Sequence, residues 1–188
     1  MIRHPLTSRS RRLSLDAFSR ADRLATVLDG SLDDGFHWFR RASPGGMEPI
    51  EAVVVGIGGT WTMGFATERA RFRHRNGHWY RWNRRTESWV PWDARPVHAA
   101  RLAARRLSLY LERATQPAQV EAVLVPERGS EVTWDAGDRL GMLVEADADR
   151  LAARIERDEV LTPAQVDRIV ALLDPRQPLP QLATSPRG

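Results

Sequence analysis

Apolar and polar residues alternate most clearly between Ile50 and Ala66, and this stretch predicts the centre of the fold. Residues 53–55 are consecutive valines, which is typical of a strand buried on both faces. Glycines at positions 56, 58 and 59 can adopt the positive φ angles that a tight reversal needs. Apolar residues at 61, 63 and 65 then alternate with small or polar ones at 60, 62 and 64, the period of a second strand. The stretch therefore predicts two adjacent strands joined by a glycine turn.

The remaining periodicities predict helices and strands in alternation, as in an α/β domain. Apolar residues spaced three and four apart predict helices at about 15–29, 96–114, 148–155 and 163–173, the last preceded by a capping box at Thr162. Short apolar or alternating runs predict further strands at 36–40, 88–92, 120–125, 132–134 and 142–144. We therefore expect one domain over residues 15–174, with a mixed β-sheet flanked by helices. A flexible basic arm is expected at residues 1–14 and a disordered, proline-rich tail at residues 175–188.

Residues 69–92 contain the most unusual pattern in the chain. Asn76-Gly77 between alternating residues is a signature of a two-residue β-hairpin turn. That turn predicts cross-strand pairs of Arg75 with His78, Arg73 with Tyr80 and Arg71 with Trp82, all on one face. The strand at 88–92 then extends the hairpin into an arginine- and tryptophan-rich meander.

The composition is that of an ordinary soluble globular protein, because 42% of the 188 residues are apolar and 28% are charged. No apolar run approaches the roughly 18 residues of a membrane span, so no membrane partner is expected, and no apolar segment marks a signal peptide. Cysteine is absent, which excludes disulfides and thiolate chemistry and favours a reducing, cytoplasmic location. All 28 basic residues are arginine. Two interpretations stay open: codon bias of a GC-rich genome, or selection for phosphate binding by the planar guanidinium.

Residues 50–66, IEAVVVGIGGTWTMGFA, also resemble a motif of the nuclease-related domain (NERD) family, whose fold is that of restriction-type endonucleases. The family run resembles I-D-H-V-V-V-G-P-x-G-V-F-V-I-(D/E)-x-K and holds the catalytic acids and lysine. In this chain the first acid falls on Glu51, the second on Gly64 and the lysine on Ala66. A family glutamine that opens a long helix falls on His98. The resemblance covers about residues 15–174 and implies a restriction-endonuclease-like fold with a degenerate catalytic motif.

Cleavage by such a domain requires carboxylates around Mg²⁺ or Mn²⁺ and a cation that stabilises charge on the phosphate. Glycine and alanine at two of the three motif positions supply neither group. We therefore expect no catalytic activity, metal site or other cofactor, with Glu51, Glu68 and His98 as vestigial or relocated candidates. One rescue stays open. If the second strand continues beyond Ala66, Glu68 points to the same side as position 64, and Arg69 or Arg71 supplies positive charge, giving a Mg²⁺- or Mn²⁺-dependent nuclease with a relocated site.

The predicted hairpin face combines guanidinium groups with aromatic rings, as do surfaces that contact single strands or phosphate backbones. The candidate nucleic-acid-binding residues are Arg71, Arg73, Arg75, Tyr80, Trp82, Arg84 and Arg85. The first hypothesis is a catalytically degenerate domain that binds nucleic acid, DNA rather than RNA. As the resemblance implies, it would be accessory to DNA processing or repair. Two alternatives stay open for the same face: arginine–aromatic pairs that only stabilise an exposed sheet, or a tryptophan-rich interface with a second copy or another protein.

Overall fold

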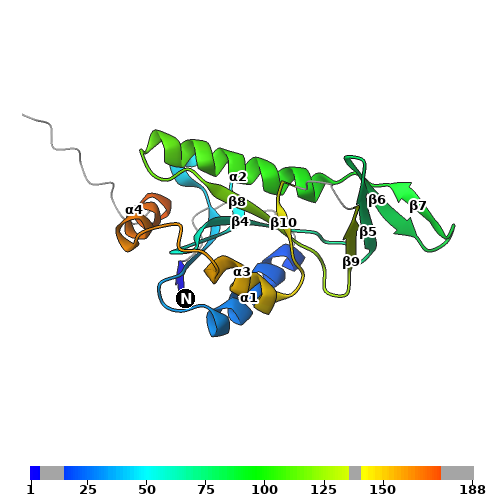
Figure 1. Cartoon of the computed structure of the whole chain (residues 1–188), viewed down its shortest axis with the longest axis horizontal. Coiled ribbons are helices and arrows are strands. Elements are labelled where there is room, and N and C mark those ends of the chain that lie inside the picture. Colours follow the sequence, from blue (N-terminus) through cyan, green and yellow to red (C-terminus); the bar gives the residue numbers. More distant parts are fainter. Residues whose placement is uncertain (5–14, 136–140, 175–188) are drawn as a thin grey trace, which may run out of the picture.

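The computed structural model describes residues 1–4, 15–135 and 141–174, which form two β-sheets and the helices that cover them (Figure 1). The larger sheet lies between two layers of helices, and the smaller sheet adjoins one end of it (Figure 1). Helix α2 (Arg95–Arg113) runs along one face of the larger sheet, and α4 (Pro163–Leu173) packs on strands β2 and β3. Helices α1 (Leu15–Ser31) and α3 (Ala148–Glu156) cover the opposite face. The chain is therefore a mixed α/β protein, as its periodicities predict.

The larger sheet has six strands in the order β1-β2-β3-β4-β8-β10. Their bounds are β1 (Ile2–His4), β2 (His37–Ala42), β3 (Ile50–Gly56), β4 (Gly59–Phe65), β8 (Val120–Val125) and β10 (Leu143–Val144). Strands β2, β3 and β4 pair antiparallel, whereas β1 with β2, β4 with β8, and β8 with β10 pair parallel. A short 3₁₀ turn (Pro44–Gly46) joins β2 to β3. The parallel pairing of β4 with β8 needs a crossover connection, and helix α2 supplies it.

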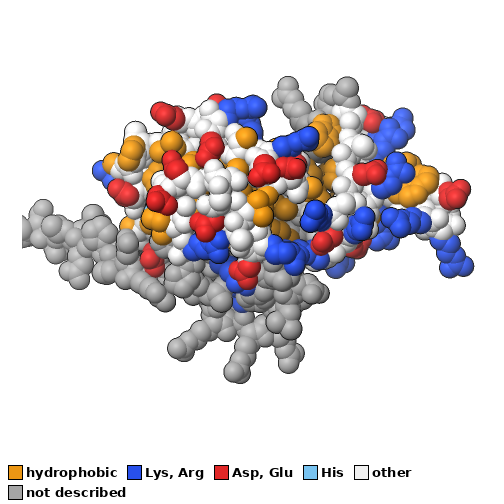
Figure 2. Space-filling model, turned by 90° about the horizontal axis from the view of Figure 1, so that it is seen from below, with side chains coloured by type: hydrophobic (Ala, Val, Ile, Leu, Met, Phe, Trp, Pro, Cys, Tyr) orange, Lys and Arg blue, Asp and Glu red, His pale blue; other side chains and the backbone are white. Residues whose placement is uncertain are grey.

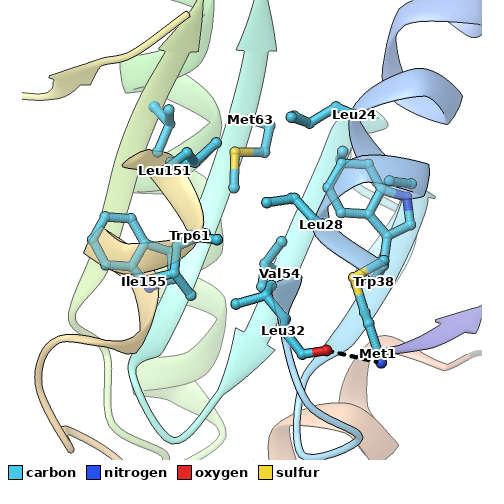
Figure 3. Packing of buried hydrophobic residues seen from close by; sticks show 14 of the residues in the cluster. Met1, Leu24, Leu28, Leu32, Trp38, Val54, Trp61, Met63, Leu151 and Ile155 are labelled. Atoms are coloured by element: carbon cyan, nitrogen blue, oxygen red, sulfur yellow. Dashed lines mark hydrogen bonds between the residues drawn. The ribbon is translucent and has the colours of Figure 1, made fainter. Parts of the chain in front are cut away.

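Strands β3 and β4 are the centre of the larger sheet, as the valine run and the glycine turn predict. Every residue of β4 is buried, and Glu51 is the one residue of β3 that is only half-buried. Trp61 and Met63 of β4 face the helices α1 and α3, where they pack with Leu28 and Ile155 (Figure 3). The small and polar residues of β4 lie on the other face, beneath helix α2.

The smaller sheet has the order β7-β6-β5-β9. Its strands are β5 (Arg71–Arg75), β6 (His78–Asn83), β7 (Ser88–Pro91) and β9 (Glu131–Trp134). Strands β5 and β6 pair antiparallel around Asn76-Gly77, with Arg75 opposite His78 and Arg73 opposite Tyr80. The inner face of this sheet carries Phe72 and Trp79, which are buried against Val97 of α2. The outer face is turned away from that core.

The two sheets are joined because β4 and β8 end side by side and their chains leave the larger sheet together. The Ala66 N–H donates to the Val125 carbonyl at 3.1 Å, and the Glu131 N–H donates to the Ala70 carbonyl at 3.2 Å. Strands β5 and β9 then continue this parallel arrangement. As a result β9 does not extend the larger sheet, and the expectation of one mixed sheet is corrected to two.

The expected N-terminal arm, C-terminal tail and helix cap can each be compared with the structure. Residues 2–4 form strand β1, paired in parallel with β2, so this part of the expected arm belongs to the larger sheet. Residues 5–14 and the expected tail at 175–188 lie outside the described residues. The capping box of α4 is confirmed, because Thr162 Oγ1 accepts from the Gln165 N–H and Gln165 Oε1 accepts from the Thr162 N–H.

Across residues 1–4, 15–135 and 141–174, none of the helices is long and apolar enough to cross a membrane.

Candidate functional site

The position of the family's first acid, Glu51, lies at the start of β3 in a groove of about 380 Å³ beneath the first half of α2. The β3–β4 ladder pairs Ala52 with Met63, which places Glu51 opposite Gly64. Its Oε2 accepts a hydrogen bond from the Phe65 N–H at 3.1 Å. Burial raises the pKa of the Glu51 carboxyl above its ordinary value of 4.5, while that hydrogen bond and the charge of Arg20 act in the opposite direction. Two carboxyl groups therefore line the groove: Glu51, with its raised pKa, and Glu48, which pairs with Arg106.

The position of the second acid is closed by helix packing. A Cβ at Gly64 would lie 2.8 Å from the Cβ of Ala100 on α2 and 3.5 Å from its Cα. Because real Cβ atoms do not approach one another this closely, α2 can rest on β4 at this point only if residue 64 is glycine. A carboxylate at this position would require the helix to move away from the sheet.

The position of the family lysine, Ala66, is buried, and a different cation contacts its backbone. Arg20 of α1 donates from Nη1 to the Ala66 carbonyl at 2.7 Å and lies 2.8 Å from Glu127. Arg20 is thus the cation that acts on Glu51, and sequence reasoning did not single it out. No local signal identifies it, because it meets β4 from a helix at the start of the chain.

The alternative of a relocated site depends on Glu68 turning toward position 64. Strand β4 ends at Phe65, so the continuation that would turn Glu68 toward position 64 does not exist. Glu68 instead pairs with Arg81 of β6 at 2.6 Å. Arg69 lies against the Gly129 carbonyl, and His98 lines a separate pocket beside the smaller sheet. In the described ranges, no three histidine or acidic side chains are grouped so as to hold a metal ion.

The outer face of the smaller sheet brings together most of the residues that the sequence selected. Arg73 lies opposite Tyr80, and Tyr80 lies opposite Pro91 on β7. Arg71 carries its guanidinium carbon 5.6 Å from the centre of the Trp82 ring and 6.0 Å from that of Trp89. These two rings contact each other at 5.4 Å in an edge-to-face arrangement. The face therefore presents guanidinium groups and half-exposed aromatic rings side by side.

Acidic residues of β9 and the segment after it pair with the arginines of this face. Arg71 lies 2.8 Å from Glu131, while Arg73 and Arg75 lie 2.9 and 3.4 Å from Asp135. No local pattern predicts either acid as a partner, since both follow the hairpin by about sixty residues and only the parallel pairing of β5 with β9 brings them near. These side chains are all more than a third exposed, and such surface pairs contribute only about 0–1 kcal/mol each. A phosphate group can therefore compete with them.

Arg84 and Arg85 occupy the exposed turn between β6 and β7, and within the described part of the chain neither side chain has an ion pair. The Asn83 side chain accepts from the Arg85 N–H at 2.9 Å and so helps to shape the turn. Residues 68–93 carry seven arginines and three acids, a net charge of +4, which equals the net charge of the whole chain. Arginine side chains gather accordingly over this end of the molecule (Figure 2, right).

Neither a protein-family model, nor a curated protein, nor a solved structure matches this chain. Its own surface and packing are therefore the basis for a functional assignment.

Proposed function

We propose that the protein is a catalytically degenerate, nuclease-like domain that binds nucleic acid, DNA in preference to RNA, through the outer face of the smaller sheet. The residues that bind are Arg71, Arg73, Arg75, Tyr80, Trp82, Arg84 and Arg85. The resemblance to the nuclease-related domain family makes its role an accessory one in DNA processing or repair.

The observation that carries this proposal is the joint exposure of cations and rings on one rigid surface. Guanidinium groups neutralise backbone phosphates, and aromatic rings stack on bases of any sequence. The Arg71 guanidinium lies near both the Trp82 and the Trp89 ring, so this surface presents a cation and two aromatic rings side by side. The turn arginines extend the positive charge beyond the sheet.

Two observations support the nuclease-like but degenerate part of the proposal. Apart from the inserted strands β5, β6 and β7, the elements from α1 to β8 follow the order α1-β2-β3-β4-α2-β8, with β4 and β8 parallel, which suits a restriction-endonuclease-like core. The contact of Gly64 with Ala100 suits a scaffold in which the second acid has been replaced by close packing.

A direct test measures binding of fluorescently labelled single- and double-stranded DNA across a series of salt concentrations. The variant is Arg84→Ala/Arg85→Ala, and the matched control is Arg105→Ala/Arg113→Ala, which removes two exposed arginines from helix α2. We expect the turn variant to weaken binding and to reduce the slope of log affinity against log salt by about 2, or roughly 1 per lost phosphate contact. The control should leave the slope unchanged.

Absence of binding by the wild-type protein at low salt would refute the proposal. In that event the half-exposed Trp82 and Trp89 rings favour the second candidate, an interface with another copy or another protein. Light scattering on Trp82→Ala distinguishes the two, because only an interface between copies loses mass when this ring is removed.

A further inference from the structure

A pocket of about 410 Å³ lies where the smaller sheet meets the first turns of helix α2. Its walls come from the hairpin turn, the start of β6, the end of β7 and the start of α2. The lining residues are Gly77, His78, Trp79, Tyr80, Pro91, Trp92, Ala94 and His98. Its volume falls within the range of about 300–1,000 Å³ that is usual for small-ligand sites.

One wall of the pocket is a firmly held indole. The Trp92 ring lies 4.4 Å from the buried Phe72 ring and 5.9 Å from the Trp79 ring. The backbone N–H of Trp92 also donates to the Trp79 carbonyl at 3.0 Å. Because these contacts already hold the Trp92 ring in place, stacking on a flat ligand costs little further conformational entropy of this side chain.

Two imidazoles provide the polar groups of the pocket. His78 and His98 are both exposed, and in the described part of the chain neither side chain has a hydrogen-bond or ion-pair partner. A neutral imidazole offers one donor and one acceptor. The pocket thus pairs flat apolar walls with free donors and acceptors at its rim, which suits a planar heterocycle that has polar edges.

The pocket is continuous with the arginine face through Tyr80. This residue lines the pocket and lies opposite Arg73 on β5. Arg75 lies opposite His78, at the pocket's other outer edge. A phosphate held by these arginines therefore lies next to an opening in which the attached base can be received.

We propose that this pocket takes an unpaired base of single-stranded DNA, stacked on the Trp92 ring, while the neighbouring arginines hold its phosphates. The inference rests on the proposed nucleic-acid binding. It narrows the ligand to single-stranded DNA, because a base within a duplex is not free to enter the pocket. In this arrangement His98, which the resemblance aligns with the family glutamine, contacts the edge of the base.

The test compares two labelled strands of about 12 nucleotides, an oligodeoxythymidylate and an abasic strand of the same length and charge. Affinities are measured at low salt for wild type, Trp92→Ala, Trp92→Phe and His98→Ala, with circular dichroism as a check on folding. We expect wild type to bind the thymidylate strand about 5- to 100-fold more tightly than the abasic strand. Trp92→Ala should remove most of this preference, whereas Trp92→Phe, which keeps an aromatic ring, should preserve much of it. His98→Ala should reduce the preference to a smaller extent and serves as the test if Trp92→Ala does not fold.

Each other outcome refutes a different statement. Equal binding of both strands overturns the base pocket and leaves phosphate binding by the arginine face intact. A preference for bases that survives both Trp92→Ala and His98→Ala overturns the pocket, since stacking then occurs elsewhere, as on Trp82. Absence of binding to either strand overturns the proposed function and the pocket together.

Discussion

The contact between Gly64 and helix α2 allows a quantitative prediction for Gly64→Ala. The added Cβ would lie 2.8 Å from the Ala100 Cβ, closer than real Cβ atoms approach, and both atoms belong to buried, regular elements. Gly64 does not have a positive φ angle, so the substitution adds no backbone strain, and the steric overlap alone sets the cost. Overpacking of this kind destabilises a core by about 1–3 kcal/mol. We expect Gly64→Ala to lower the free energy of unfolding by that amount.

Urea denaturation and thermal melting measure this loss. For a chain of this length each kcal/mol lowers the melting temperature by about 2–4 °C. Gly30→Ala is the matched control, because no atom lies within 4 Å of the added Cβ and the residue sits in helix α1. Alanine is favoured over glycine in a helix by about 0.5–1 kcal/mol, so the control should have the opposite sign.

A double-mutant cycle with Ala100→Gly isolates the contact itself. Ala100→Gly alone should cost about 1 kcal/mol of helix propensity, but in the Gly64→Ala background it also removes the overlapping atom. The coupling should therefore be favourable by about 1–3 kcal/mol. A Gly64→Ala protein as stable as wild type, or a coupling near zero, would refute the statement that α2 closes this position.

Three further predictions follow from other parts of the structure. Burial raises the pKa of Glu51 above 4.5, so the contribution of this group to stability is fully present below pH 4.5 and is lost as the pH rises through its folded-state pKa. The variant Glu51→Gln keeps an acceptor for the Phe65 N–H and should flatten the profile of melting temperature against pH above pH 4.5. An unchanged profile would contradict this prediction. Asp135→Asn releases Arg73 and Arg75 from their ion pairs and should tighten DNA binding at low salt, with an effect that fades as salt is added; weaker binding would count against the arginine face. Thr162→Ala removes the cap of α4 and should cost about 1 kcal/mol in urea denaturation, whereas no change would mean that water replaces the cap without loss.

Local patterns were sufficient to predict most of the elements. The valine run and the glycine turn predict β3 and β4, and Asn76-Gly77 predicts the pairing of Arg73 with Tyr80. Both predictions succeed because the information lies within a few neighbouring residues: a period of two and a turn that accepts positive φ angles. The cap of α4 is a signal of the same kind.

The features that were missed all depend on distant segments. Nothing near Arg71 in the sequence reveals that Glu131 will pair with it, or that β9 will join β5 and not the larger sheet. Likewise, the glycine at position 64 is visible in the sequence, but its packing partner, Ala100, lies on a helix that follows the smaller sheet's first three strands. Parallel strand pairing and helix-on-sheet contacts are long-range, and periodicity carries no information about them.

The parallel pairing of β5 with β9 has a practical consequence for protein engineering. The smaller sheet is built from two separate pieces of chain, residues 66–94 and 126–135, which leave the larger sheet side by side. Moving only the first piece onto another scaffold would leave β5 with a bare hydrogen-bonding edge, a common cause of aggregation. It would also remove Glu131 and Asp135, and so alter the charge that the transplanted surface presents. A successful chimera must carry both pieces, placed after two adjacent parallel strands of the recipient.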